Sequence, residues 1–135
     1  MRSEFFMPMA RVPTVTHQEQ QVSCKSGKPV FYEPTELKTA RIKLKGHLSR
    51  HVPEKKYTGA IRVVVKWLYP ITGKHQDGEY KTTKPDCDNA IKLLNDICTD
   101  LGFWKDDAII ASLVIEKFYA DQPGIYVCIE SLEGR

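Results

Sequence analysis

The chain has 135 residues, of which 41% are hydrophobic and 27% are charged. This length suits one globular domain with a real core, and the composition is ordinary for a soluble protein. No run approaches the roughly 20 apolar residues of a membrane span, and the first residues lack the features of a signal peptide, so we expect a single cytoplasmic domain over residues 1–135.

The net charge of +3 conceals an uneven distribution along the chain. Residues 25–84 contain 14 Lys and Arg against 5 Asp and Glu, whereas residues 85–135 contain 4 against 10. Basic side chains bind a polyanion because they release its counterions. Carboxylates repel phosphates unless a cation lies between them. This pattern favours a metal-dependent enzyme acting on nucleic acid. The alternative is that the basic half is simply a solvated surface.

The amino-terminal half predicts an edge strand, a loop and a helix. Two prolines restrict any strand within residues 7–16 to the edge of a sheet. Residues 23–29 are polar and basic, which predicts a flexible loop that closes over a phosphate backbone or is a plain linker. A helix is predicted from about Pro34 to His51, because apolar residues recur at three- and four-residue intervals. These apolar residues are Leu37, Ala40, Leu44, Leu48 and Val52.

The carboxy-terminal half predicts three strands. The clearest covers residues 59–70, where β-branched and aromatic side chains alternate onto one face. Two further strands, in antiparallel directions, fit residues 108–119 and 125–130 on either side of a Pro-Gly turn. Together these elements indicate an α+β fold with a small mixed sheet of about four strands and two main helices.

The second main helix is predicted between the first and second of these strands. Asp88 or Asn89 can cap its amino end and Gly102 can end it, which gives about thirteen or fourteen residues. The side expected to face a core carries Ala90, Ile91, Leu94, Ile97, Cys98 and Leu101. The side expected to face a cleft carries Asp88, Lys92, Asn95, Asp96 and Thr99.

Carboxylates gather at both ends of this second helix. Asp86 and Asp88 flank one residue, so in an extended lead-in both side chains point the same way and can bind one ion. Lys92 stands one turn beyond Asp88, where its ammonium group can pair with that carboxylate or hold a phosphate oxygen. Asp106 and Asp107 follow the helix, and strand geometry lets only one of them face the same site. Such carboxylates suit a hard dication, Mg²⁺ above all, and indicate phosphodiester chemistry.

The third carboxylate can arrive by two routes. The helix from Asp88 to Leu101 spans about 20 Å, and the chain from Leu101 to Asp107 reaches about 20 Å only if it is fully extended. A tight turn at Gly102 would therefore just return Asp107 to the first two aspartates. Otherwise a second subunit supplies it, and the sequence leaves both routes open.

An Asp-x-Asp pair also occurs in further classes of protein, and aspartates favour helix N-termini even without any metal. An EF-hand would need glycine and glutamate where the chain has Ile91 and Ile97. A sugar-nucleotide transferase uses the same pair, but this chain is short and lacks a glycine-rich turn after a strand. The four cysteines have no paired spacing, which argues against zinc. These classes therefore fit the chain less well than a magnesium-dependent nuclease.

The ordered motif around the second helix resembles the signature of the RusA family of Holliday junction resolvases. The matching residues are Lys84-Pro85-Asp86-Cys87-Asp88-Asn89, Lys92, Asp96, Gly102-Phe103-Trp104 and Asp106-Asp107. The resemblance implies that Asp86, Asp88 and Asp107 are catalytic carboxylates that bind the metal, and that Lys92 is the essential lysine.

The same resemblance implies a small mixed α/β homodimer that acts on branched DNA in recombination and repair. Members cut four-way junctions by paired symmetric nicks with Mg²⁺, for which Mn²⁺ substitutes, so neither a membrane nor a small-molecule substrate is expected. Selectivity for four-way junctions over other branched DNA stays open. The alternative function is a non-catalytic DNA-binding module whose aspartates are structural.

Overall fold

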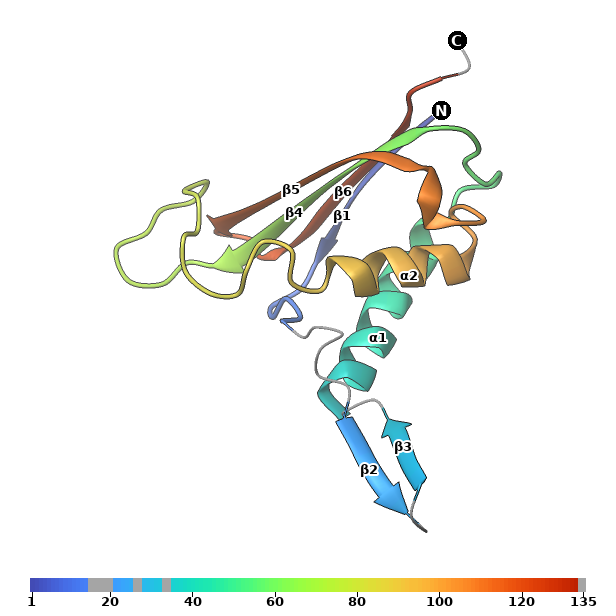
Figure 1. Ribbon diagram of the computed structural model, residues 1–135. Helices are drawn as coiled ribbons and strands as arrows, with labels where there is room; N and C mark the ends of the chain where they lie inside the picture. The colour runs from blue at the N-terminus through green and yellow to red at the C-terminus, as the bar shows by residue number, and fades with distance from the viewer. Residues whose placement is uncertain (15–20, 26–27, 33–34, 134–135) are drawn as a thin grey trace.

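The computed structural model describes residues 1–14, 21–25, 28–32 and 35–133 of the chain. The elements in chain order are β1 (Arg2–Pro8), β2 (Gln21–Lys25), β3 (Lys28–Tyr32), α1 (Thr35–Leu48), η2 (Ser49–His51), β4 (Ile61–Pro70), α2 (Ile91–Leu101), η3 (Asp107–Ile109), β5 (Ile110–Ala120) and β6 (Gly124–Ser131). A four-stranded sheet has the order β1-β6-β4-β5, and β2 and β3 form a separate two-stranded sheet (Figure 1).

The four-stranded sheet is mixed, because β4 pairs antiparallel with β6 and parallel with β5. β1 completes the sheet on the far side of β6, again antiparallel. Parallel neighbours need a crossover connection, since the chain must return to the starting end of the sheet. Here the crossover contains α2, which lies with α1 on one face of the sheet (Figure 1).

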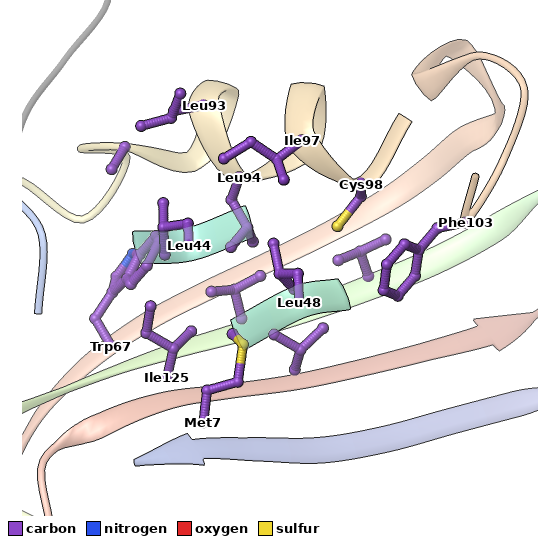
Figure 2. Close-up of a cluster of buried hydrophobic side chains, with 14 of the residues drawn as sticks. Met7, Leu44, Leu48, Trp67, Leu93, Leu94, Ile97, Cys98, Phe103 and Ile125 are labelled. Atoms are coloured by element: carbon purple, nitrogen blue, oxygen red, sulfur yellow. The ribbon is translucent and has the colours of Figure 1, made fainter. Parts of the chain in front are cut away.

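The hydrophobic core fills the space between this sheet and the two helices (Figure 2). Every second residue of β4 is buried, because alternate side chains of a strand point to the same face. Leu44 and Leu48 of α1 and Leu94 and Ile97 of α2 complete the core from the other side. Burial of each such side chain contributes about 1.5–3 kcal/mol. The core therefore holds α2, and the chain segments on either side of it, against the sheet.

The opposite face of the sheet carries charges that compensate one another. Arg62 in β4 forms an ion pair with Glu130 in β6, with 3.1 Å between nitrogen and oxygen. Lys66 lies over the ring of Tyr126, with 5.2 Å from its Nζ to the ring centroid, and the Tyr126 hydroxyl donates a hydrogen bond to Glu4. Strand register places three basic and three acidic side chains on this face, namely Arg2, Arg62, Lys66, Glu4, Glu116 and Glu130.

The predicted fold class is confirmed, because the structure is α+β with a four-stranded mixed sheet and two main helices. The helix expected to end at His51 corresponds to α1 and the short 3-10 helix that follows, while Pro34 lies outside the described residues. The strand expected at 59–70 is β4. In the described part of the chain, no helix is both long and apolar enough to cross a membrane.

Two predictions for the amino-terminal part are wrong. The edge strand expected within residues 7–16 lies earlier, as β1, because pairing with β6 continues only to Pro8. Residues 9–14 form no strand, and residues 15 and 16 lie outside the described ranges. Residues 23–29 were expected to form a loop but belong to the antiparallel pair β2 and β3, with residues 26 and 27 not described. Pairing between two short segments overrides their loop-like composition.

The strands expected at 108–119 and 125–130 are β5 and β6. They run in antiparallel directions, as predicted, but β4 lies between them. The three residues 121–123 carry the chain across the end of β4. Both strands pair with β4, because β4 has the most regular buried face. Strands that are consecutive in the sequence are therefore not adjacent in the sheet.

Two glycines provide opposite tests of this packing. Gly46 lies inside α1, and beyond the helix's own backbone no atom of the described residues lies within 4 Å of an added Cβ, so we expect Gly46→Ala to raise the free energy of unfolding by about 0.5–1 kcal/mol. Gly124 has φ +156°, and an added Cβ would lie 2.4 Å from the Met7 carbonyl oxygen. We expect Gly124→Ala to lower the free energy of unfolding by about 2 kcal/mol or more. Urea unfolding measures both, and shifts of the same sign would contradict the strand packing described above.

Candidate functional site

Residues 84–90, here named the acidic loop, precede α2 and are hydrogen-bonded to the sheet. The indole of Trp67 is buried, and a buried N–H requires an acceptor. Its Nε1 donates to the Cys87 carbonyl oxygen at 2.8 Å. The Cys87 thiol in turn donates to the Ile115 carbonyl oxygen of β5 at 3.1 Å. The residue between the two aspartates is therefore fixed to both parallel strands.

A second attachment comes from Lys117 of β5. It pairs with Trp67 in the strand register, so its side chain points to the helix-covered face of the sheet. Its Nζ donates to the Thr83 carbonyl oxygen at 2.7 Å and to the Pro85 carbonyl oxygen at 2.8 Å. Sequence reasoning missed this residue, although a lysine at an otherwise apolar position of a strand is a signal that its charge has a specific partner.

The acidic loop is a series of turns, and the predicted extended lead-in is wrong. The Asn89 N–H donates to the Asp86 carbonyl oxygen at 2.9 Å, and the Ile91 N–H donates to the Asp88 carbonyl oxygen at 3.3 Å. Ala90 has φ 63°, in the left-handed region. Strand alternation therefore does not align Asp86 with Asp88. Instead, successive turns expose both side chains within one short loop.

The predicted start of the second helix also needs correction. Neither Asp88 nor Asn89 caps it: α2 begins at Ile91 after Ala90, without a side-chain cap, and has 11 residues. Its predicted end is confirmed, because Gly102 is left-handed and its N–H bonds to the last turn. Asn95, expected on the polar side, is buried.

Electrostatic contacts hold Asp86 in its ionised form. Lys84 Nζ lies 2.9 Å from Asp86 Oδ1, and this hydrogen bond and the lysine charge lower the pKa of Asp86 below its ordinary value. Lys117 adds a smaller effect in the same direction. The two side chains are 86% and 67% exposed, so solvent screens the pair and it adds little to stability. Its consequence is a carboxylate that stays negative at lower pH.

Lys92 does not pair with Asp88, the partner that helical spacing made possible. Its Nζ lies 3.7 Å from Asp96 Oδ1, one turn further along α2. The Lys92 side chain is 67% exposed, so the ion pair is weak and its ammonium group remains accessible at the first turn of the helix.

A second group of carboxylates lies at the carboxyl end of α2. A hollow of about 430 Å³ there is lined by Arg41, Asp96, Thr99, Asp100, Lys105, Asp106 and Asp107. Asp106 Oδ1 accepts a hydrogen bond from the Ala108 N–H at 2.8 Å and so caps the short 3-10 helix η3. Asp106 is thus structural in this arrangement, whereas Asp107 has no such role in the described contacts.

The two acidic groups are separated by the length of α2. Asp86 lines a different hollow, of about 500 Å³, with Thr14, Lys84, Pro85 and Asn89. Eleven helical residues span about 16 Å, and Figure 1 shows the acidic loop and η3 at opposite ends of α2. Among the described residues, no three His, Cys, Asp or Glu side chains are placed to hold one metal ion. One copy of the chain therefore does not bring Asp107 to Asp86 and Asp88.

A further oxygen donor belongs to the hollow that contains Asp86. The Oδ1 atom of Asn89 is buried and has no hydrogen-bond partner among the described residues. A buried polar atom without a partner is rare and is typical of a position where an ion or a water binds. Asn89 also lines the hollow with Asp86.

The chain is similar to known proteins over almost its whole length. A family described as endodeoxyribonuclease RusA matches residues 11–130, which include the acidic loop, α2 and Asp107. A protein of Lactococcus phage r1t named crossover junction endodeoxyribonuclease rusA is 30% identical over 119 residues, covering 87% of this chain and 88% of that protein. The uncharacterized protein YqaN of Bacillus subtilis (strain 168) is 29% identical over 123 residues, covering 83% of this chain and 86% of that protein.

The contact between Lys84 and Asp86 can be tested by titration. Because Lys84→Met removes the hydrogen bond and the charge, we expect the pKa of Asp86 to rise toward its ordinary value. The carboxylate would then lose its charge at a higher pH than in the natural protein. The NMR signal of the Asp86 carboxyl carbon measures this, with Lys74→Met in an exposed turn as the control. An unchanged Asp86 titration curve in Lys84→Met would contradict the role of the lysine.

Proposed function

The chain belongs to the RusA family of endodeoxyribonucleases, and from this membership we propose that it resolves four-way DNA junctions in recombination and repair. The proposed reaction is a pair of symmetric nicks, one in each of two opposing strands. The observation that carries the proposal is the acidic loop, in which Asp86 and Asp88 are exposed on a segment hydrogen-bonded to the sheet. Rigid attachment of this kind keeps catalytic groups in position.

The donor atoms of the site suit a hard divalent cation. Asp86 is held ionised, Asp88 is exposed two residues away, and Asn89 contributes an oxygen without a partner. Magnesium binds through one or two carboxylates and keeps other positions for water and phosphate. We assign Mg²⁺, with Mn²⁺ as a substitute, to Asp86, Asp88 and Asp107. Bound there, the ion supplies an activated water and offsets charge on the phosphate.

Asp107 would reach the metal from a second subunit. In one copy it lines the hollow at the far end of α2 from the acidic loop, which favours the second of the two routes that the sequence left open. A two-fold homodimer that sets two α2 helices antiparallel brings the end of each helix to the start of the other. Each dimer then has two sites, as two symmetric nicks require.

The acidic loop and α2 supply the residues that act on the phosphate. Asp86 and Asp88 would hold the cation to which the scissile phosphate binds. Lys92 holds a nonbridging phosphate oxygen and offsets the negative charge that develops in the transition state. Its weak pairing with Asp96 leaves it free to do so, because an exposed pair at 3.7 Å is easily exchanged for phosphate. Hydrolysis leaves a 5′ phosphate.

Substitution of one aspartate separates cutting from binding. We expect Asp88→Asn to reduce nicking of a synthetic four-way junction in Mg²⁺ by more than about 100-fold. Junction binding should persist or tighten, because the change removes a negative charge that faces phosphate. Gel assays measure both, and Asp121→Asn, in the exposed turn after β5, is the control that keeps full activity.

The same assays include the outcome that contradicts this function. Natural protein that leaves the junction uncut with every divalent metal, and binds it equally well with a chelator, is a non-catalytic DNA-binding module. Loss of folding in Asp88→Asn, seen by circular dichroism together with lost binding, would instead make that aspartate structural.

Mixed dimers test whether Asp107 acts across subunits. Asp88→Asn and Asp107→Asn homodimers should each be inactive. In a heterodimer purified through two different tags, one site combines the intact acidic loop of one copy with the intact Asp107 of the other. We therefore expect restored nicking, confined to one strand per junction. A purified heterodimer as inactive as both parents would show that Asp107 acts within its own copy.

A further inference from the structure

A third hollow, of about 820 Å³, is larger than the two that contain the acidic residues. It lies between residues 10–14, the amino-terminal half of α1 and the end of β4, and we name it the α1 hollow. Its floor is apolar, because Val12 and Ala40 belong to the hydrophobic core and Tyr69 is only 8% exposed. Mostly apolar pockets of about 300–1,000 Å³ with a few polar groups are typical sites for organic ligands.

The wall of the α1 hollow that follows β1 is fixed to the rest of the molecule. The Met9 N–H donates to the Pro123 carbonyl oxygen at 3.1 Å. The side chain of Val12 is buried in the core. Lys43 Nζ donates to the Arg11 carbonyl oxygen at 2.5 Å, which ties the wall to α1. A hollow with fixed walls binds at a lower cost in ordering than one that must first be assembled.

Polar groups are few in the α1 hollow. Burial raises the pKa of the Tyr69 phenol, so its hydroxyl stays protonated and can donate a hydrogen bond. Among the described residues this hydroxyl has no hydrogen-bond partner, whereas a buried tyrosine hydroxyl usually has one. Arg11 and Lys43 add two cations and Glu36 adds one carboxylate to the lining. An apolar floor with one free donor and cations beside it suits a flat heteroaromatic ring that is linked to phosphate.

The α1 hollow is adjacent to the hollow that contains Asp86. Thr14 lines both of them. Tyr69 and Trp67 point to the same face of β4, and two strand residues span about 7 Å. Trp67 is the residue that donates to the acidic loop. A nucleotide next to a phosphate at the acidic loop therefore has the α1 hollow within reach.

We propose that the α1 hollow takes up one unstacked nucleobase of the DNA, from a nucleotide next to the phosphate at the acidic loop. This step rests on the proposed function, which supplies branched DNA as the ligand. A base leaves the stack at lower cost where pairing or stacking is already interrupted, as at the crossover of a junction. The apolar floor receives the ring, Tyr69 donates to its edge, and Arg11 binds an adjoining phosphate.

Fluorescence of 2-aminopurine, which rises when this base leaves the stack, tests the proposal. Junctions carry it at each position next to the crossover, and chelator prevents cutting. We expect natural protein to raise the emission at one of these positions. Thr39→Trp fills the α1 hollow from an exposed position of α1, so it should abolish the rise and weaken junction binding by about tenfold.

Ile42→Trp is the matched control, because Ile42 is 73% exposed on the same helix and does not line the α1 hollow. It should behave as the natural protein does, and circular dichroism verifies the fold of both variants. Bound natural protein that raises the emission at no position would overturn the proposal. A folded Thr39→Trp variant with an undiminished rise would do the same.

The salt dependence of binding identifies the contact that Thr39→Trp removes. This variant loses no cation, so the slope of log affinity against log salt concentration should equal that of the natural protein. A flatter slope would place the loss at phosphate contacts and contradict the uptake of a base.

Photo-cross-linking locates the base directly. A junction with 4-thiothymine at the responsive position is irradiated with natural protein, and mass spectrometry identifies the attached peptide. We expect attachment to Tyr69 or to residues 10–14, which line the α1 hollow. Attachment exclusively to other parts of the chain would rule out the α1 hollow as the place of the base.

Nicking by the natural protein separates the two proposals. Junction cutting by a protein that unstacks no base supports the enzyme and rejects the α1 hollow as a base site. Uptake of a base that Thr39→Trp abolishes, in a protein that cuts no junction with any divalent metal, supports the base site and rejects the enzymatic function.

Discussion

A single hydrogen bond underlies the arrangement of the candidate site, namely the one from the buried indole of Trp67 to the Cys87 carbonyl oxygen. Trp67 is part of the hydrophobic core, and its N–H cannot be left unpaired there without a penalty of about 1–3 kcal/mol. The acceptor is the backbone of the residue between Asp86 and Asp88. Core packing and the position of the two acidic side chains are therefore coupled. A substitution in the core near Trp67 would shift the acidic loop.

Attachment by backbone carbonyls leaves the acidic side chains available. Trp67 and Lys117 both donate to main-chain oxygens, so neither occupies a carboxylate of the loop. Lys84 contacts Asp86 directly, and it does so in solvent, where the contact is easily exchanged for another cation. The loop is consequently held firmly while its charges remain open to a ligand, which is the combination that preorganised sites require.

The sequence predicted the parts of this fold that depend on local pattern. Alternation located β4, apolar spacing located α1, and Gly102 marked the end of α2. The parts that it did not predict depend on distant partners: β4 lies between β5 and β6, and β2 pairs with β3 across a loop-like segment. At the site, residue types predicted the acidic motif, and the family match covers it. Its turns, the Lys117 attachment and the separation of Asp107 from the loop follow from tertiary contacts that no local pattern contains.

The compensated charges on the uncovered face of the sheet bear on how a nucleic acid approaches. Three basic and three acidic side chains produce almost no net field on that side, so a duplex gains no counterion release by lying there. The helical side differs, because α1 carries Lys38, Arg41, Lys43 and Lys45. A nucleic acid therefore gains counterion release from the basic side chains of α1, on the side of the sheet on which the aspartates lie, and gains none from the opposite face.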